Sequence, residues 1–400
     1  MAELGARGDR RQGGRVRFIP LRRRRWITTH SGSLASVERT SPSTPTPVWR
    51  EPVRGSYPDP RLIALSGRER LESWNRGLSP PPPLMHLTGA RPTRFGSGTA
   101  DAEMPASGWL ASSTGLITGG ALAMLADIAF GCAVQTELPP ATGYTTAELS
   151  LSFLRPVRPG PMLFASGQAI HVGRSVGLSE AFVIEEGSER LLAHGTSRLT
   201  IFPPLHPAPE PPLDLEPIEP SDGERPDPYL RPPPDGVIPQ DVWSELAGAE
   251  IVRRQLAGEL PPPPVHHLTG MRPTDHGDGW ATVAIPTSEW LASPSGRLQG
   301  GVIAMLADFA MLIAVETTAP AGLAFAGLDL KVNFLRPVPP GSGYLTARAD
   351  VVHSGRTIAI TQAKVTNAED KPVALATGSS IFLPDRPASL GEVELSSEEN

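Results

Sequence analysis

The feature that most constrains the fold is an internal duplication, because the chain of 400 residues carries the same series of motifs twice. Three pairs of segments show it: PPPPLMHLTGARPT at 80–93 and PPPPVHHLTGMRPT at 261–274, GWLASSTGLITGGALAMLAD at 108–127 and EWLASPSGRLQGGVIAMLAD at 289–308, and ELSLSFLRPVRPG at 148–160 and DLKVNFLRPVPPG at 329–341. Every pair keeps one offset, the 181 positions that separate Asp127 from Asp308. Two long copies indicate a tandem duplication of one domain, since solenoids need at least three shorter units.

Composition predicts where the domains end. The 46 prolines cluster between the copies and before each of them, and residues 204–236 are acidic, proline-rich and without apolar periodicity, as in an extended linker. Five parts are expected: a disordered basic leader (1–55), a first domain with a preceding helix (56–203), the linker (204–236), a second domain with a preceding helix (237–384) and a disordered acidic tail (385–400).

Each copy predicts an α+β unit. A long helix that is apolar on every side is expected over 119–137 and 300–317, preceded by a short amphipathic helix near 59–74 and 240–260. Alternating apolar residues predict about five antiparallel strands per copy, near 99–104, 147–153, 161–172, 176–185 and 190–202 and near 280–285, 328–334, 343–353, 357–366 and 373–383. The simplest packing wraps this five-stranded sheet around the apolar helix.

One carboxylate interrupts each apolar helix. Asp127 is the only charged side chain between Thr118 and Gln135, and Asp308 holds the same place in the second copy. A capping role does not fit, because Asp127 is expected about two turns inside the helix, where no backbone N–H is free. A structural partner for a cation in its own copy is the alternative. Desolvation raises the pKa of a carboxyl group, which suits a general base near neutral pH.

Paired glycines open the two helices, Gly119-Gly120 in the first copy and Gly300-Gly301 in the second. A helix N-terminus presents N–H groups and a partial positive charge, so it can hold an anion or a polarised carbonyl oxygen. The absence of a Cβ atom lets a ligand approach the backbone, although a tight loop-to-helix turn is a common alternative use of two glycines.

These motifs resemble one known family. TGGALAMLAD and QGGVIAMLAD are similar to the segment of PaaI-like hotdog-fold acyl-CoA thioesterases that begins with HGG and ends with LAD. LSFLRPV and VNFLRPV are similar to the strand of that family that contains FLRP. The resemblance covers both copies and implies two hotdog domains that pair into one continuous sheet within the chain, with active sites between them. It implies no cofactor, since coenzyme A enters as part of the substrate.

The resemblance also implies roles for single residues. Asp127 and Asp308 would act as general base or nucleophile, and the Gly119 and Gly300 amides would polarise the thioester carbonyl. Candidate substrate-binding residues are the neighbouring glycines, the residues that replace the family's His and Asn, and the arginines of its Gly-Arg turn, which would contact phosphates of coenzyme A: Gly120, Gly301, Thr118, Gln299, Ser112, Ser293, Arg174 and Arg356.

The expected function is hydrolysis of an acyl- or aryl-CoA thioester to the free acid and coenzyme A. The acyl group would enter an apolar pocket lined by residues such as Leu122, Met124 and Met305. Two alternatives stay open: a non-catalytic acyl-CoA binding protein, favoured by the missing His before the glycines, and a hotdog dehydratase, which would want a catalytic His near the carboxylate.

Composition limits the partners and the compartment. A net charge of −6 argues against nucleic-acid binding. No apolar run reaches about 18 residues without a charge, so the sequence predicts no membrane span. Clustered Cys and His ligands are missing, so no metal is expected. A single cysteine and no signal-like apolar stretch after the arginines at 22–25 favour the cytoplasm. Whether the fused pair dimerises further is left open.

Overall fold

The computed structural model describes residues 47–188, 190–212, 215–218 and 225–389. The first copy contains α1 (Gly67–Asn75), α2 (Pro83–Thr88), β1 (Arg91–Phe95), β2 (Thr99–Pro105), α3 (Gly119–Gln135), β3 (Tyr144–Phe153), β4 (Met162–Val172), β5 (Val176–Glu185) and β6 (Leu191–Ile201). The second contains α4 (Gln240–Glu245), α5 (Gly248–Leu256), α6 (Pro264–Thr269), β7 (Arg272–Gly277), β8 (Trp280–Pro286), α7 (Gly300–Glu316), β9 (Ala324–Phe334), β10 (Tyr344–Ser354), β11 (Ile358–Thr366) and β12 (Pro372–Leu383).

The strands of both copies form one antiparallel sheet. Within the described residues it has twelve strands in the order β1-β2-β4-β5-β6-β3-β9-β12-β11-β10-β8-β7. The copies join at its centre, where β3 pairs with β9 and Leu149 and Leu151 lie opposite Val332 and Leu330. All four of these side chains are buried, so the junction belongs to the hydrophobic core. The predicted pairing of two α+β units within one chain is confirmed.

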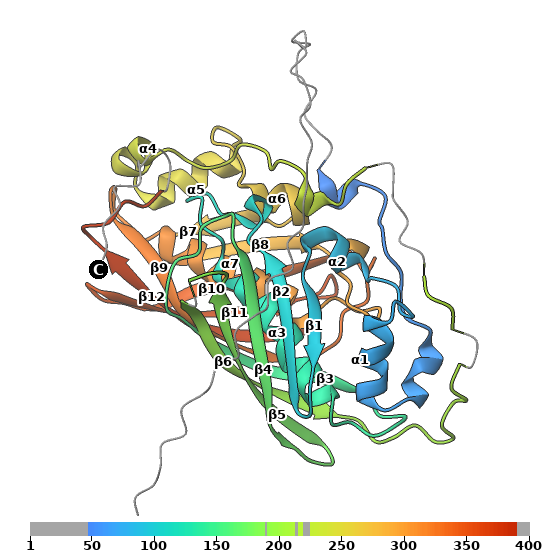
Figure 1. Ribbon diagram of the computed structural model, residues 1–400. Helices are drawn as coiled ribbons and strands as arrows, with labels where there is room; N and C mark the ends of the chain where they lie inside the picture. Colours follow the sequence, from blue (N-terminus) through green and yellow to red (C-terminus); the bar gives the residue numbers. More distant parts are fainter. Residues whose placement is uncertain (1–46, 189, 213–214, 219–224, 390–400) are drawn as a thin grey trace, which may run out of the picture. The chain divides into compact units, whose positions relative to one another are not determined.

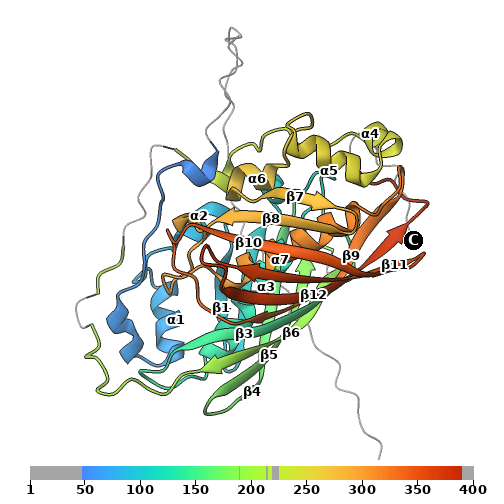
Figure 2. The ribbon, with the colours of Figure 1, turned by 180° about the vertical axis from the view of Figure 1, so that it is seen from behind.

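The two long helices lie together on the inner side of the sheet (Figures 1 and 2). α3 packs on β2, β4 and β5, and α7 packs on β8, β10 and β11, while the helices also contact each other. Because each helix has neighbours on every side, its residues are apolar all round, and almost all of them are buried.

The second glycine of each pair makes the contact between the helices possible. A Cβ atom on Gly120 would lie 2.4 Å from the Cα atom of Met305, and one on Gly301 would lie 2.3 Å from the Cα atom of Met124. These positions therefore serve helix–helix packing and not the approach of a ligand, which corrects the substrate-binding role predicted for Gly120 and Gly301.

The prediction of five strands per copy is wrong by one. Each copy has six strands among the described residues, because the short edge strands β1 and β7 were missed. Both begin with Arg-Pro and carry a register shift after the proline, so they lack the alternation that marks a buried strand. The predicted helix over 240–260 is also divided, into α4 and α5, between Glu245 and Gly248.

Three segments predicted as leader, linker or tail are partly packed. Residues 1–46 lie outside the described residues, but Val48 is buried and Trp290 Nε1 donates to the Glu51 carbonyl oxygen at 3.1 Å. In the predicted linker, Trp109 Nε1 donates to the Arg231 carbonyl oxygen at 2.8 Å. In the predicted tail, the Ser389 amide donates to Gln240 Oε1 at 2.8 Å. The side chains of two buried tryptophans, Trp109 and Trp290, thus bond to backbone carbonyls of segments that lack apolar periodicity. Residues 390–400 lie outside the described part.

Candidate active site between the two copies

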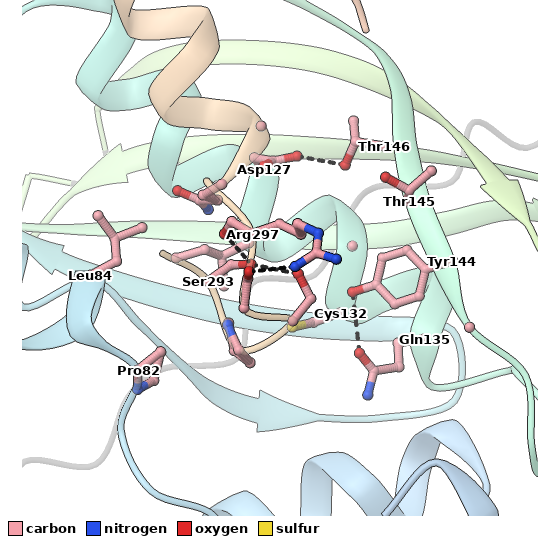
Figure 3. Close-up of a pocket in the computed structure, with 18 of the residues that line it drawn as sticks. Pro82, Leu84, Asp127, Cys132, Gln135, Tyr144, Thr145, Thr146, Ser293 and Arg297 are labelled. Atoms are coloured by element: carbon pink, nitrogen blue, oxygen red, sulfur yellow. Dashed lines mark hydrogen bonds between the residues drawn. The ribbon is translucent and has the colours of Figure 1, made fainter. Parts of the chain in front are cut away.

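Asp127 lies in the middle of α3, and its carboxylate is held by both copies. Thr146 Oγ1, on β3 of the same copy, donates to Asp127 Oδ1 at 2.9 Å (Figure 3). The amide of Gly301, at the start of α7 in the other copy, donates to Asp127 Oδ2 at 3.0 Å. The side chain is 7% exposed. The carboxylate therefore lies where the two copies meet, which is where the family resemblance places the active sites.

The environment of Asp127 moves its pKa in two directions. Burial raises the pKa above the usual value of a carboxyl group, and this is the largest effect. The hydrogen bonds from Thr146 and from the Gly301 amide favour the ionised form and lower the pKa. A carboxylate whose pKa is raised by burial is a stronger base than a solvated one, and its two donors keep it oriented.

The N-terminus of α7 faces this carboxylate. Gly300 is the first residue of α7, so its N–H has no acceptor within the helix. A Cβ atom on Gly300 would lie 3.1 Å from Asp127 Oδ2, which shows how closely the helix start approaches the carboxylate. Gln299, just before it, donates from Nε2 to the Met124 carbonyl oxygen at 3.1 Å. Within the described residues, Gln299 Oε1 is a buried acceptor without a hydrogen-bond partner.

A cavity of about 940 Å³ opens beside Asp127. It follows one face of α3, the beginning of β3, α1 and the second copy's loops, and its lining includes Ile128, Gly131, Cys132, Gln135, Tyr144, Thr145, Thr146, Arg70, Leu71, Trp74, Ser293, Arg297, Gln299, Gly300 and Arg336. Arg297 and Arg336 are exposed although they line it, so they mark where the cavity reaches solvent. A cavity of this volume accommodates a small organic group.

The site around Asp308 has the same backbone arrangement but different surrounding side chains. The Gly120 amide donates to Asp308 Oδ2 at 2.8 Å, and burial raises the pKa of Asp308 to about 7 although this bond lowers it. Gly327 occupies the position of Thr146, and a Cβ atom there would lie 3.6 Å from the Leu312 side chain. The hydroxyl donor of the first site therefore has no counterpart at this position.

Bulkier side chains also surround Asp308. At the offset of the duplication, Phe309 and Leu312 replace Ile128 and Gly131. The Phe309 ring packs edge-on against the ring of His266, with centroids 5.2 Å apart. Burial lowers the pKa of His266 to about 3, so this histidine is a neutral packing residue.

Of the remaining predicted site residues, one lines the cavity and four do not. Ser293 lines the cavity, and Thr118 caps α3 by accepting the Ala121 amide at 3.3 Å. Ser112 bonds within its own turn, to Thr114 at 2.8 Å. Arg174 and Arg356 lie in exposed turns after β4 and β10, outside the lining of this cavity.

The predicted pocket lining from Leu122, Met124 and Met305 is wrong. All three are buried in the core, and Met124 and Met305 lie at the contact between α3 and α7. The face of α3 that lines the cavity begins at Asp127 and continues through Ile128, Gly131, Cys132 and Gln135. Periodicity could not select this face, because every face of the helix is apolar.

Sequence reasoning also missed Thr146, Tyr144 and Arg70. These residues come from β3 and α1, so nothing near Asp127 in the sequence marks them. A comparison of the two copies could have marked them, because these three polar residues are replaced in the second copy by Gly327, Phe325 and Ile251.

In the described ranges, no group of three or more His, Cys, Asp or Glu side chains is arranged to hold a metal ion. The same ranges contain no helix with the length and apolar character needed to cross a membrane.

Comparison with known proteins adds independent information. The model of the family described as "Thioesterase superfamily" matches residues 114–191 and again 295–374, once in each copy. The acyl-coenzyme A thioesterase PaaI of Escherichia coli is 31% identical over 103 residues, which cover 26% of this chain and 71% of that protein. The 1,4-dihydroxy-2-naphthoyl-CoA hydrolase of Listeria monocytogenes is 30% identical over 99 residues, covering 24% of this chain and 78% of that protein.

A solved structure with similarity across both copies is an acyl-CoA thioesterase II of Mycobacterium marinum. It has 14% sequence identity and a TM-score of 0.46, and the match covers 75% of this chain and 98% of that one.

Proposed function

The chain belongs to the thioesterase superfamily, as a thioester hydrolase with two hotdog domains, and from that membership we propose that it hydrolyses acyl-CoA thioesters at Asp127. The observation that carries the proposal is the meeting of the Asp127 carboxylate with the start of α7 beside a cavity. A base, an N–H donor and space for an acyl group are the parts that thioester hydrolysis needs.

In the proposed reaction, Asp127 takes a proton from a water molecule, whose oxygen attacks the thioester carbonyl carbon. The Gly300 amide donates to the carbonyl oxygen and stabilises the negative charge that develops there. The tetrahedral intermediate then breaks its C–S bond, which releases the free acid and the thiol of coenzyme A, and the proton held by Asp127 returns to the departing sulfur. Direct attack by the Asp127 carboxylate is the variant of this mechanism, with an anhydride intermediate.

Thr146 and Gly301 are positioning residues in this proposal. Their donors bind different oxygens of Asp127, one from each copy, so the carboxylate plane is fixed relative to the start of α7. Because proton transfer requires the base within hydrogen-bond reach, this fixation favours turnover.

Two observations favour Asp127 over Asp308. The cavity lies beside Asp127. Two of its lining residues, Ile128 and Gly131, are replaced near Asp308 by the bulkier Phe309 and Leu312. Asp308 also lacks the hydroxyl donor that Thr146 supplies, since Gly327 stands there. We therefore propose one working site in each chain.

The entrance of the cavity suits coenzyme A. Arg297 and Arg336 are exposed there, and both belong to loops of the second copy that flank the start of α7. Guanidinium groups bind phosphates in pairs of hydrogen bonds, so these two arginines are our candidates for the phosphates of coenzyme A.

The test is thiol release from a panel of acyl-CoA thioesters by the wild type, Asp127→Asn and Asp308→Asn. Loss of a general base costs about 10²–10⁴-fold, so we expect Asp127→Asn to lose activity by this factor. Asp308→Asn is the matched control, at the same position of the second copy, and should retain most of the activity.

Two results would contradict the proposal. A folded Asp127→Asn variant with wild-type turnover would exclude Asp127 as the base. A wild type that binds acyl-CoA without releasing thiol would instead support a binding protein.

A further inference from the structure

The part of the cavity that α1 borders is lined by an arginine that has no anionic partner among the described residues. Arg70 lies in α1, which packs on the end of α3, since the Gly67 amide donates to the Leu138 carbonyl oxygen at 2.9 Å. Arg70 Nη2 donates to the Thr142 carbonyl oxygen at 2.8 Å. In the part of the chain that the structure describes, Arg70 Nε is buried without a hydrogen-bond partner and no carboxylate forms an ion pair with this guanidinium.

Two polar side chains, Tyr144 and Gln135, also line the cavity. The Tyr144 hydroxyl donates to Gln135 Oε1 at 3.2 Å (Figure 3). Gly131 makes room for the tyrosine, because a Cβ atom there would lie 2.8 Å from the Tyr144 hydroxyl oxygen. Burial raises the pKa of Tyr144, and the positive charge of Arg70 acts against this rise, which is consistent with the two groups being neighbours.

The fold itself does not require these polar groups. In the second copy, Gly248 contacts the end of α7 as Gly67 contacts the end of α3, with its amide bonded to the Ala319 carbonyl oxygen at 2.9 Å. At the duplication offset, Ile251 stands for Arg70, Phe325 for Tyr144 and Leu312 for Gly131. The second copy thus builds the same framework with apolar residues, so the cation of the first copy points to a ligand.

Two parts of the cavity lining come from different elements. Arg297 and Arg336 mark the solvent end, next to the start of α7. Arg70, Tyr144 and Gln135 line the part of the cavity that α1, the last residue of α3 and the beginning of β3 border. Asp127 and Gln135 are eight residues apart on α3, or about 12 Å along the helix axis. A thioester at Asp127 with its coenzyme A toward solvent would therefore direct its acyl chain toward Arg70.

We propose that the acyl group accepted at the Asp127 site ends in a carboxylate, which pairs with Arg70, so that the substrate is the CoA monothioester of a dicarboxylic acid. This inference rests on the proposed thioesterase function and adds the chemical class of the acyl group. A carboxylate offers acceptors to the buried Nε of Arg70 and to a hydroxyl donor such as Tyr144. An uncharged acyl chain would leave the guanidinium without an anion at a site where water is largely displaced.

The experiment compares kcat/KM for pairs of thioesters of equal chain length: adipoyl- and hexanoyl-CoA, suberoyl- and octanoyl-CoA, sebacoyl- and decanoyl-CoA. We expect the wild type to prefer the carboxylated member of at least one pair by 10-fold or more. Removing one partner of a buried charge pair costs about 30-fold or more, so Arg70→Met should lose this preference and bring the ratio close to one.

Two further variants accompany Arg70→Met. Arg70→Lys keeps the charge without the planar fork and should retain part of the preference. Arg68→Met is the matched control, because Arg68 lies on the same helix outside the cavity lining, and it should leave the ratio as in the wild type. If Arg70→Met does not fold, as judged by thermal unfolding, Tyr144→Phe replaces it and should lower the same ratio.

The possible failures are distinguishable. A wild type that hydrolyses acyl-CoA but prefers the uncharged member of every pair would overturn this inference and leave the proposed function standing. A preference that survives Arg70→Met unchanged would also overturn it. A wild type that hydrolyses none of these thioesters would overturn the proposed function, and this inference with it.

Discussion

Glu316 and Gln135 occupy the same position in the two copies, at the last residue of each long helix. Gln135 Nε2 donates to the Gly67 carbonyl oxygen at 3.3 Å. Glu316 is 5% exposed, and within the described residues its Oε1 is buried without a hydrogen-bond partner. Burial raises the pKa of Glu316 from 4.5 to about 8. The second copy therefore keeps a neutral carboxylic acid where the first copy has an amide.

Replacing Glu316 by Gln should stabilise the protein at alkaline pH. The carboxyl group keeps its proton in the folded state up to about pH 8 but releases it near pH 4.5 when unfolded, so its contribution to stability is lost as the pH rises between these values. Since one pKa unit corresponds to about 1.4 kcal/mol, Glu316→Gln should add a few kcal/mol above pH 8 and almost nothing near pH 4.

Urea unfolding at pH 4.5 and pH 8.5 measures this difference. Glu245→Gln, on the exposed surface of α4, is the control and should show no such dependence on pH. Equal stability of the wild type and Glu316→Gln at pH 8.5 would mean that the Glu316 carboxyl is solvated.

At this scale the sequence predicted the residues whose signal is local. A charge inside an apolar helix is visible without a structure, so Asp127 and Asp308 were found. Arg70 and Tyr144 were not found, because their role depends on which cavity α1 and β3 border. Single-residue properties do not encode that arrangement.

The contact between α3 and α7 is the element that the glycine pairs control. The ideal Cβ positions of Gly120 and Gly301 lie within 2.4 Å of backbone atoms of the opposite helix, and backbone cannot move aside as the end of a side chain can. Overpacking of this kind costs about 1–3 kcal/mol or more. The helix propensity gained by alanine, about 1 kcal/mol, offsets only part of it.

Gly301→Ala should therefore lower the midpoint of thermal unfolding by several degrees and also reduce thioesterase activity, because the Gly301 amide holds Asp127. Gly143→Ala is the control, since its Cβ atom would make an ordinary contact of 3.5 Å with Phe202. Wild-type stability of Gly301→Ala would show that the helices can separate without cost.

Elements with strong periodicity were predicted and the weak ones were missed. The long helices and ten of the twelve strands in the described residues follow apolar patterns that a sequence displays directly. β1, β7, α2 and α6 are short, and each has a proline as its first or second residue. They form because neighbouring strands and the other copy offer a surface, as when the Leu84 amide donates to the Ala292 carbonyl oxygen at 3.3 Å.

For the whole molecule, the decisive contact is the one between the copies. β3 pairs with β9 through the centre of the sheet, and the base and the N–H donor of the proposed site come from opposite halves. Each half alone would expose a long strand edge and an apolar helix face, which favours association or aggregation.

Separate expression of residues 47–236 and 237–389 should therefore give two inactive products. Co-expression should restore a complex with thioesterase activity, because the complex recreates the meeting of Asp127 with the start of α7. Size-exclusion chromatography and thiol release measure both results. A first half that is an active, stable monomer would contradict the assignment of the oxyanion donor to Gly300.

Fusing the copies has a consequence for how this protein can evolve. In a dimer of identical chains a single gene specifies both sites, and any substitution changes them together. Here Thr146 and Gly327, or Gly131 and Leu312, are separate codons for equivalent positions. A mutation at Gly327 or Leu312 changes the surroundings of Asp308 and leaves the cavity near Asp127 untouched, so one half can specialise in chemistry while the other serves as its scaffold.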